Sequence, residues 1–268
     1  MKINRSNASQ KFNAYVKDYD INNEKIRLKI EHTYKVAKLC EEIAKSESLS
    51  EEDTDMAWLI GLLHDIGRFE QLRRFNTFID SQSIDHAAFG ADLLFVNGLI
   101  REFVKDNSCD ILMEKAIRTH NAFRLPDDFD ERTLMFCNIL RDADKIDILR
   151  VNVETPLEEI YNVSTEKLRN DEISEKVLGS FFEESATLRA YKKTSVDNLA
   201  GHISLVYELV YPYSIREAHR QGFLYKIMDF QSNNPHTREQ FLVIKKQVAS
   251  YLDKRLGKSD ISGGKDGA

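Results

Sequence analysis

Residues 56–67, MAWLIGLLHDIG, are the most apolar stretch of the chain. Near its end the stretch contains a histidine followed directly by an aspartate, His64 and Asp65. The stretch is apolar on nearly every side of a helix, which predicts a helix in the centre of the fold. Ser50 opens a capping-box pattern that predicts the start of this helix, and Gly67 predicts its end. A carboxylate at the end of such a helix is costly unless it is paired or binds a metal. We therefore expect a helical core with a polar site at one end.

The rest of the chain also has helical periodicity, and strand-like alternation bounded by turn residues is hard to find. Glycine (11 residues) and proline (4 residues) are scarce, which leaves few breaks between elements. The pattern predicts an all-α protein in which 68–83 is a polar loop with short helical pieces. The predicted helices outside the apolar stretch cover 24–46, Ser83 or Asp85 to Val104, 109–121, 131–150, and a series that begins near Thr155 and Pro156 and runs to 256, with caps at Ser174 and Thr194.

Three parts are expected along the chain: a helical core over 1–150, a C-terminal helical extension packed on it over 151–256, and a disordered tail over 257–268. The N-terminus has no apolar signal core, and no apolar run could span a bilayer. Three scattered cysteines favour a reducing compartment, so we expect a cytoplasmic protein. The net charge of −6 argues against non-specific binding to nucleic acid or an anionic membrane. The C-terminal half is expected to shape a pocket or to form a homo-oligomer interface.

Four histidines in the first 120 residues each lie on a different predicted helix. A single histidine on an apolar helix is more often a core residue than a ligand. Here, however, the histidines are accompanied by two carboxylates that also project from apolar stripes, and a metal centre explains the whole set. The six candidate ligands are His32, His64, Asp65, His86, His120 and Asp144.

The number of candidate ligands favours two metal ions. Six side chains are too many for one four-coordinate zinc that keeps an open position. Imidazole and carboxylate ligands suit Fe, Mn, Co, Ni or Zn, and Mg is a further option. Asp65 is the expected bridge, because its neighbour His64 already holds one ion. Gly90, one turn after His86, is expected to leave room for something bulky beside that ring.

The ordered set resembles the HD-domain superfamily, whose pattern is a histidine, then His-Asp, then an aspartate on a later helix. The matching segments are IEHTYKVA with His32, LLHDIGRFE with His64 and Asp65, and RDADKIDIL with Asp144. The binuclear branch adds two histidines, which match His86 in DHAAFGADLL and His120 in AIRTHN. The resemblance covers roughly 25–150 and implies an HD-type helical bundle with additional C-terminal helices.

The resemblance implies a metal-dependent phosphohydrolase that acts on a phosphomonoester or phosphodiester, frequently a nucleotide. Two divalent ions and two carboxylates leave a charge of about +2, which would attract a phosphate, and a metal lowers the pKa of its bound water toward ~7. We expect Asp65, Arg68 and Lys145 to act in catalysis, and Arg68, Arg73 and Lys145 to bind the small phosphorylated substrate. No sequence-specific nucleic-acid partner is expected.

Three alternatives remain at this stage. Some HD-type proteins use the same ligand set to hold two irons and activate oxygen, so an oxygenase is the first alternative. The second is a nucleotide-sensing module without catalysis, and the third is a metal-free helical protein with buried histidines. Outside the pattern, Asp142 is expected behind the ligands or at the surface, His202 in the core, and His219 and His236 at the surface.

Overall fold

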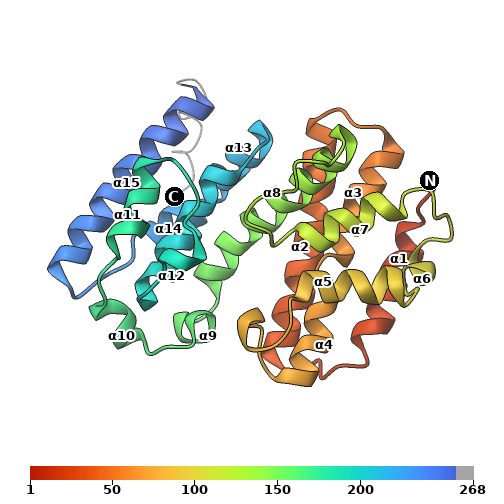
Figure 1. Ribbon diagram of the computed structural model, residues 1–268, viewed down its shortest axis with the longest axis horizontal. Helices are drawn as coiled ribbons and strands as arrows, with labels where there is room; N and C mark the ends of the chain where they lie inside the picture. The colour runs from red at the N-terminus through yellow and green to blue at the C-terminus, as the bar shows by residue number, and fades with distance from the viewer. Residues whose placement is uncertain (258–268) are drawn as a thin grey trace. The chain divides into compact units, whose positions relative to one another are not determined.

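The computed structural model describes residues 1–257, and every regular element in that range is helical (Figure 1). This confirms the all-α fold class. The chain divides into two compact units, Met1–Asp144 (unit 1) and the residues from Lys145 onward (unit 2). The division falls inside one continuous helix, α8 (Glu131–Glu154), a few residues before the predicted boundary at 150.

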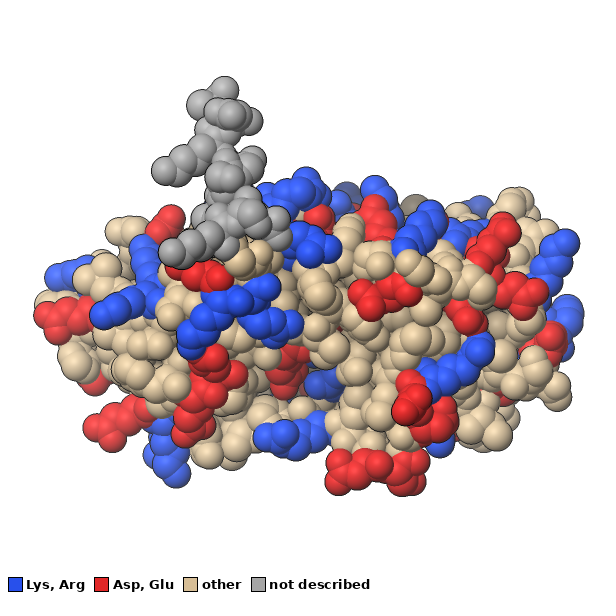
Figure 2. Space-filling view, turned by 90° about the horizontal axis from the view of Figure 1, so that it is seen from above, with Lys and Arg blue, Asp and Glu red and all other residues tan. Residues whose placement is uncertain are grey.

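The predicted disordered tail lies, from residue 258, outside the described residues. Within residues 1–257, no helix combines the length and apolar character needed to cross a bilayer. Basic and acidic side chains alternate over the face drawn in Figure 2, without a broad area of one sign.

Unit 1 is organised around α2 (Glu24–Ser46) and α3 (Glu51–Leu63), which pack along their lengths. Both begin as predicted: the side chains of Asn23 and Ser50 accept hydrogen bonds from backbone amides of the first turn. Residues 56–63 are all buried, as expected for a central helix. The other helices of unit 1 are α1 (Arg5–Val16), α4 (Ile66–Phe75), α5 (His86–Ala91), α6 (Ile100–Phe103), α7 (Asp110–Thr119) and the first part of α8.

Small residues set the distance between α2 and α3. A Cβ atom at Gly61 would lie 2.8 Å from the Cα of Ala37 and 2.9 Å from the Sγ of Cys40. Because the two helices approach this closely, the histidine on α2 and the histidine at the end of α3 reach the same space, and the rings of His32 and His64 lie 5.3 Å apart.

The predicted helix end at Gly67 is wrong. The central helix ends at Leu63, the chain turns at His64 and Asp65, and Gly67 lies inside the next helix, α4. A Cβ atom at Gly67 would lie 2.5 Å from the carbonyl oxygen of His86 and 2.8 Å from the amide nitrogen of Gly90. This glycine therefore serves a close contact between α4 and α5 rather than a chain reversal. The same contact fills the room that was expected beside the ring of His86.

Three further predictions about unit 1 need correction. The helix α1 precedes the first predicted helix, and its buried Ala8, Phe12 and Val16 recur every fourth residue. The long helix predicted to end at Val104 is divided into α5, a π-helical segment over Asp92–Val96, and the short α6. The predicted polar loop covers 68–83, but the non-helical segment begins only after Phe75, where α4 ends.

Unit 2 consists of the end of α8 followed by short amphipathic helices and one long terminal helix. Thr194 forms a capping box with Asp197 at the start of α12, as expected of a cap. Ser174 also occupies the cap position of its helix, but its hydroxyl donates to Asp197 instead of capping. The helices are α9 (Leu157–Tyr161), α10 (Thr165–Asn170), α11 (Glu175–Phe182), α12 (Ser195–Ile203), α13 (Pro212–Gln221), α14 (Phe223–Met228) and α15 (Pro235–Leu256).

Candidate metal centre

The six predicted ligands come together in unit 1 from separate parts of the chain. Four of them are placed by helix ends or the turn between helices, and two project from the long helices α2 and α8. Their positions are His32 on α2, His64 at the C-terminal cap of α3, Asp65 in the following turn, His86 at the first position of α5, His120 at the C-terminal cap of α7, and Asp144 on α8.

The carboxylate of Asp65 lies between two groups of imidazoles. Its Oδ2 atom is 3.7 Å from His32 Nε2 and 3.6 Å from His64 Nε2. Its Oδ1 atom is 3.4 Å from His86 Nε2 and 3.8 Å from His120 Nε2. Each oxygen therefore faces its own pair of ring nitrogens, which is the arrangement that a carboxylate bridging two ions requires.

Asp144 completes the group around Oδ2. Its Oδ1 atom lies 3.1 Å from His32 Nε2 and 3.8 Å from His64 Nε2. We call His32, His64, Asp144 and the Oδ2 atom of Asp65 the first half-site, and His86, His120 and the Oδ1 atom of Asp65 the second half-site. The ligand atoms of His32, His64 and Asp144 lie within 4.8 Å of one another, as do those of His64, Asp65 and His120.

Hydrogen bonds at the outer ring nitrogens orient three of the histidines. His64 Nδ1 donates to the carbonyl of Gly61, and His120 Nδ1 donates to the carbonyl of Ile117, each at 2.7 Å. Both carbonyls lie three residues earlier, in the last turn of the helix that the histidine caps. His86 Nδ1 donates to Asp80 Oδ2, also at 2.7 Å. A neutral imidazole that donates from Nδ1 has a bare lone pair on Nε2, and all three Nε2 atoms face the cluster.

Three of the inward nitrogens lack the partners that a metal-free protein would need. His64 Nε2 is buried without any hydrogen-bond partner. His86 Nε2 and His120 Nε2 lie 3.1 Å apart, although both rings already donate from Nδ1. Two lone pairs at that distance repel each other unless a cation lies beside them. Nitrogen and oxygen ligands of this kind suit a divalent transition metal, so the residues fit the predicted metal centre.

Burial keeps three of the histidines neutral and therefore ready to bind a cation. Burial lowers the pKa of His64, and burial lowers the pKa values of both His86 and His120 to about 4. Burial also acts to raise the pKa of Asp65, but Lys29, His64, His86 and Arg68 together hold it well below the usual range. The carboxylate is therefore ionised, as a bridging ligand has to be.

Lys29 is the closest cation to the bridging carboxylate, and the sequence analysis did not single it out. Its Nζ atom lies 2.7 Å from Asp65 Oδ2, with 19% of the side chain exposed. Lys29 precedes His32 by three residues on α2, and residues at that spacing share a helix face. That spacing was the available signal, because a cation one turn from a predicted ligand faces the same centre.

Asp80 is the second residue that the sequence analysis did not single out. Its Oδ2 atom accepts from His86, while its Oδ1 atom accepts from Arg68 Nη1 at 2.8 Å and from Gln71 Nε2 at 3.0 Å. These charged and polar donors hold its pKa far below the usual range against the effect of burial. Asp80 lies in the segment after α4, where no periodicity distinguishes it from neighbouring polar residues.

The arginine and lysine candidates occupy three different environments. Arg68 adjoins the centre: its Nε atom is buried, makes no hydrogen bond and lies 3.7 Å from Asp65 Oδ1. Its Nη1 atom donates to Asp80 and to the carbonyl of Phe78 at 2.6 Å, so Arg68 also secures the loop after α4.

The remaining two predicted substrate ligands contact other groups. Arg73 pairs with Glu70 and lies over the ring of Tyr19, and 56% of its side chain is exposed. Lys145 Nζ lies 3.1 Å from Glu208 Oε2 in unit 2. Their predicted roles at the phosphate stay predictions.

The acid and the histidines outside the pattern are placed as follows. Asp142 is fully buried, so the surface alternative for it is wrong. His202 donates from Nδ1 to Asn152 in unit 2 at 2.7 Å, in agreement with a packing role. His236 is exposed, whereas His219 is half-buried against the hydroxyl of Tyr225.

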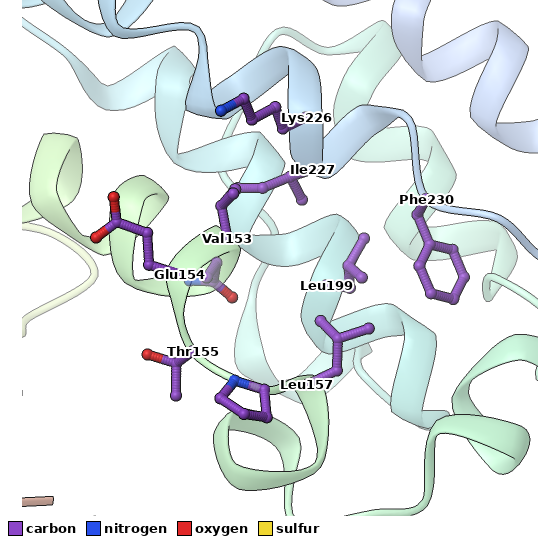
Figure 3. A pocket seen from close by; sticks show the side chains of 10 residues that line it. Val153, Glu154, Thr155, Leu157, Leu199, Lys226, Ile227 and Phe230 are labelled. Carbon is purple, nitrogen blue, oxygen red and sulfur yellow. The ribbon is translucent and has the colours of Figure 1, made fainter. Parts of the chain in front are cut away.

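Unit 2 has an apolar pocket of about 410 Å³ between the end of α8 and the helices α12 and α14 (Figure 3). Its lining includes the apolar side chains of Val153, Leu157, Leu199, Ile227 and Phe230, which Figure 3 shows around the hollow. Its lining includes no cysteine or histidine that could add a ligand to the metal centre.

Comparison with known proteins agrees with the site. The family model described as HD domain matches residues 30–151, a range that contains all six candidate ligands. No curated protein and no solved structure matches the chain.

Proposed function

Because residues 30–151 form an HD domain, and because HD domains generally belong to metal-dependent hydrolases, we propose that this protein hydrolyses a phosphomonoester or phosphodiester with the help of two divalent ions. The observation that carries the proposal is the position of the Asp65 carboxylate, whose two oxygens face separate pairs of histidine nitrogens. The first half-site would hold one ion and the second half-site the other.

A bound pair of divalent ions supplies Lewis acidity toward a phosphoryl oxygen and lowers the pKa of water toward ~7. The protein contributes the orientation of the ligands. The carbonyls of Gly61 and Ile117 and the carboxylate of Asp80 fix the tautomers of three rings, so the lone pairs already face inward before an ion arrives.

The cations beside the centre support a phosphorylated substrate. Lys29 and Arg68 lie on opposite oxygens of Asp65, at 2.7 Å from Oδ2 and 3.7 Å from Oδ1. Both can turn donors toward a phosphate that approaches the centre, because a guanidinium matches phosphate oxygens and an ammonium acts as a point charge. Nucleotides are the substrate class we propose first, since the resemblance to HD-type enzymes implies them.

The test combines metal analysis with a substrate screen. Protein purified without added metal is expected to contain up to two ions per chain, and His64→Ala and Asp65→Ala should remove most of the metal and the phosphatase activity. His120→Ala should remove about one ion, because it alters only the second half-site. Unchanged metal content in all three variants would refute the centre.

The same preparations separate hydrolysis from oxygen chemistry. Phosphate release from nucleotides or phosphodiesters under anaerobic conditions would support the proposal. Oxygen consumption by the iron-loaded protein without phosphate release would replace it by an oxygenase. Nucleotide binding without turnover across several metals would replace it by a sensing role.

A further inference from the structure

A basic pocket of about 360 Å³ lies in unit 2, between α10 and the segment that leads into α12. Four cationic side chains line it together with hydroxyl and amide groups, and its lining includes no carboxylate. Its residues are Lys167, Arg189, Lys192, Lys193, Thr194, Ser195 and Asn198. We propose that this basic pocket binds the phosphate group of a small molecule.

Lys192 carries the argument, because its ammonium is half-buried and makes no hydrogen bond and no direct ion pair among the described residues. Burial lowers the pKa of Lys192, and the charge of Arg189 lowers it further, while Asp197 opposes this. An anion in the basic pocket would supply the missing partner and favour the charged ammonium.

The position of Lys192 depends on a glycine. A Cβ atom at Gly201 would lie 2.4 Å from Lys192 Cε and 2.5 Å from its Nζ. The lysine side chain therefore lies directly against the backbone of α12, and residue 201 has to lack a side chain for it to stay there. The ammonium therefore lies against α12 at the edge of the basic pocket.

Side chains, rather than the start of α12, would bind the anion. The backbone amides of Lys193 and Thr194 donate to Asp197, at 2.7 and 2.9 Å, and the amide of Ser195 donates to Asp171 at 2.9 Å. These amides are already used, and Lys167 already pairs with Asp171, so the ammonium groups of Lys192 and Lys193 are the donors that remain for a ligand.

The charge balance selects the ligand class. The lining has four positive charges, and Asp171 and Asp197, which adjoin it, offset two of them. This excess of positive charge favours an anion, and a terminal phosphate has a charge of about −1.5 to −2 at neutral pH. The volume of about 360 Å³ is in the range of small-molecule sites.

Binding of pyrophosphate to the full-length protein tests the proposal. Titration calorimetry is done on an Asp65→Asn background, which weakens phosphate binding at the metal centre, and at constant ionic strength. We expect Lys192→Met to weaken pyrophosphate binding by about tenfold or more, because a charge-assisted contact is lost. Gly201→Ala should also weaken it, since the added methyl group displaces the ammonium. Lys246→Met, which removes an exposed lysine on α15, is the matched control and should change affinity less than twofold.

Chemical labelling locates the ligand independently of any variant. Lysine acylation followed by peptide mass spectrometry should modify Lys192 in the free protein, and pyrophosphate should protect it while Lys246 stays reactive. Equal affinity in Lys192→Met, or loss of all pyrophosphate binding in Asp65→Asn, would overturn the proposal. Tighter binding of an RNA oligonucleotide that also protects Lys192 would overturn the small-molecule ligand. None of these readouts depends on hydrolysis, so the result is separate from that of the proposed function.

Discussion

Replacement of Asp80 by alanine should convert a two-ion centre into a one-ion centre. Asp80 is not a predicted ligand, but it accepts the Nδ1 proton of His86 at 2.7 Å and thereby keeps the Nε2 lone pair directed inward. Loss of a residue that orients a metal ligand typically costs about 10- to 100-fold in metal affinity, or about 1.4–2.7 kcal/mol. The Asp80 carboxylate accepts hydrogen bonds from His86, Arg68 and Gln71, so the cost should fall on the second half-site.

The assay is metal stoichiometry by elemental analysis, followed by competition titration with a chelator. At limiting free metal we expect about one ion per chain in Asp80→Ala, against about two in the unmodified protein. Asp80→Asn should lie between them, because the amide oxygen still accepts from His86 but has no charge. Asp92→Asn is the matched control, since Asp92 pairs with Arg118 at 2.7 Å and half of its side chain is exposed.

Two outcomes would refute this reasoning. Full occupancy with unchanged affinity in Asp80→Ala would show that the hydrogen bond does not hold the ring. Equal loss of both ions would show that the half-sites are not separable. Urea unfolding of the metal-free variants separates the loss of protein stability from the loss of metal affinity. We expect Asp80→Ala to lower the free energy of unfolding by about 1–3 kcal/mol, because the partners of Asp80 lose their acceptor.

Three further predictions follow from single contacts. Gly67→Ala should lower the free energy of unfolding by about 1–3 kcal/mol, because the new methyl group meets the backbone of His86 at 2.5 Å; unchanged urea midpoint and metal content would contradict this. Lys29→Met should strengthen metal binding by about tenfold, because a positive charge 2.7 Å from Asp65 Oδ2 competes with the ion, while KM for a phosphate ester rises; weaker metal binding in a chelator titration would count against it. Burial lowers the pKa of His202 to about 3, so below pH 6.5 the unfolded chain takes up a proton that the folded protein does not, and stability falls by up to about 1.4 kcal/mol per pH unit toward pH 3. Urea titrations at pH 7 and pH 5 should show a smaller loss in His202→Gln, and identical losses would disprove the assignment.

Local patterns in the sequence were sufficient where a single helix decides the structure. The helix α2 has the predicted bounds, since a polar cap, apolar periodicity and a polar end all agree at Glu24–Ser46. The set of six ligands was also accessible, because each projects from an apolar stripe that had to face the core. The only further condition was that these stripes meet in the fold.

Contacts between distant segments were not accessible in the same way. Gly67 looked like a helix end, because a glycine after an apolar helix usually is one, but its role is set by His86 and Gly90 on another helix. Asp80 lies in a segment without periodicity, where the sequence does not distinguish it from the neighbouring polar residues. Only the fold brings it to His86. In unit 2, no motif indicated that Lys192 and its neighbours line a common hollow.

The position of Asp65 between the two half-sites also divides the candidate centre into two parts that can change separately. The histidines of the second half-site come from α5 and α7, which pack on each other, whereas the other ligands come from α2, α3 and α8. A substitution confined to α5 or α7 can abolish one ion while the remaining four ligands keep their geometry. A one-ion and a two-ion enzyme with the same fold could then differ by the substitution of a single histidine.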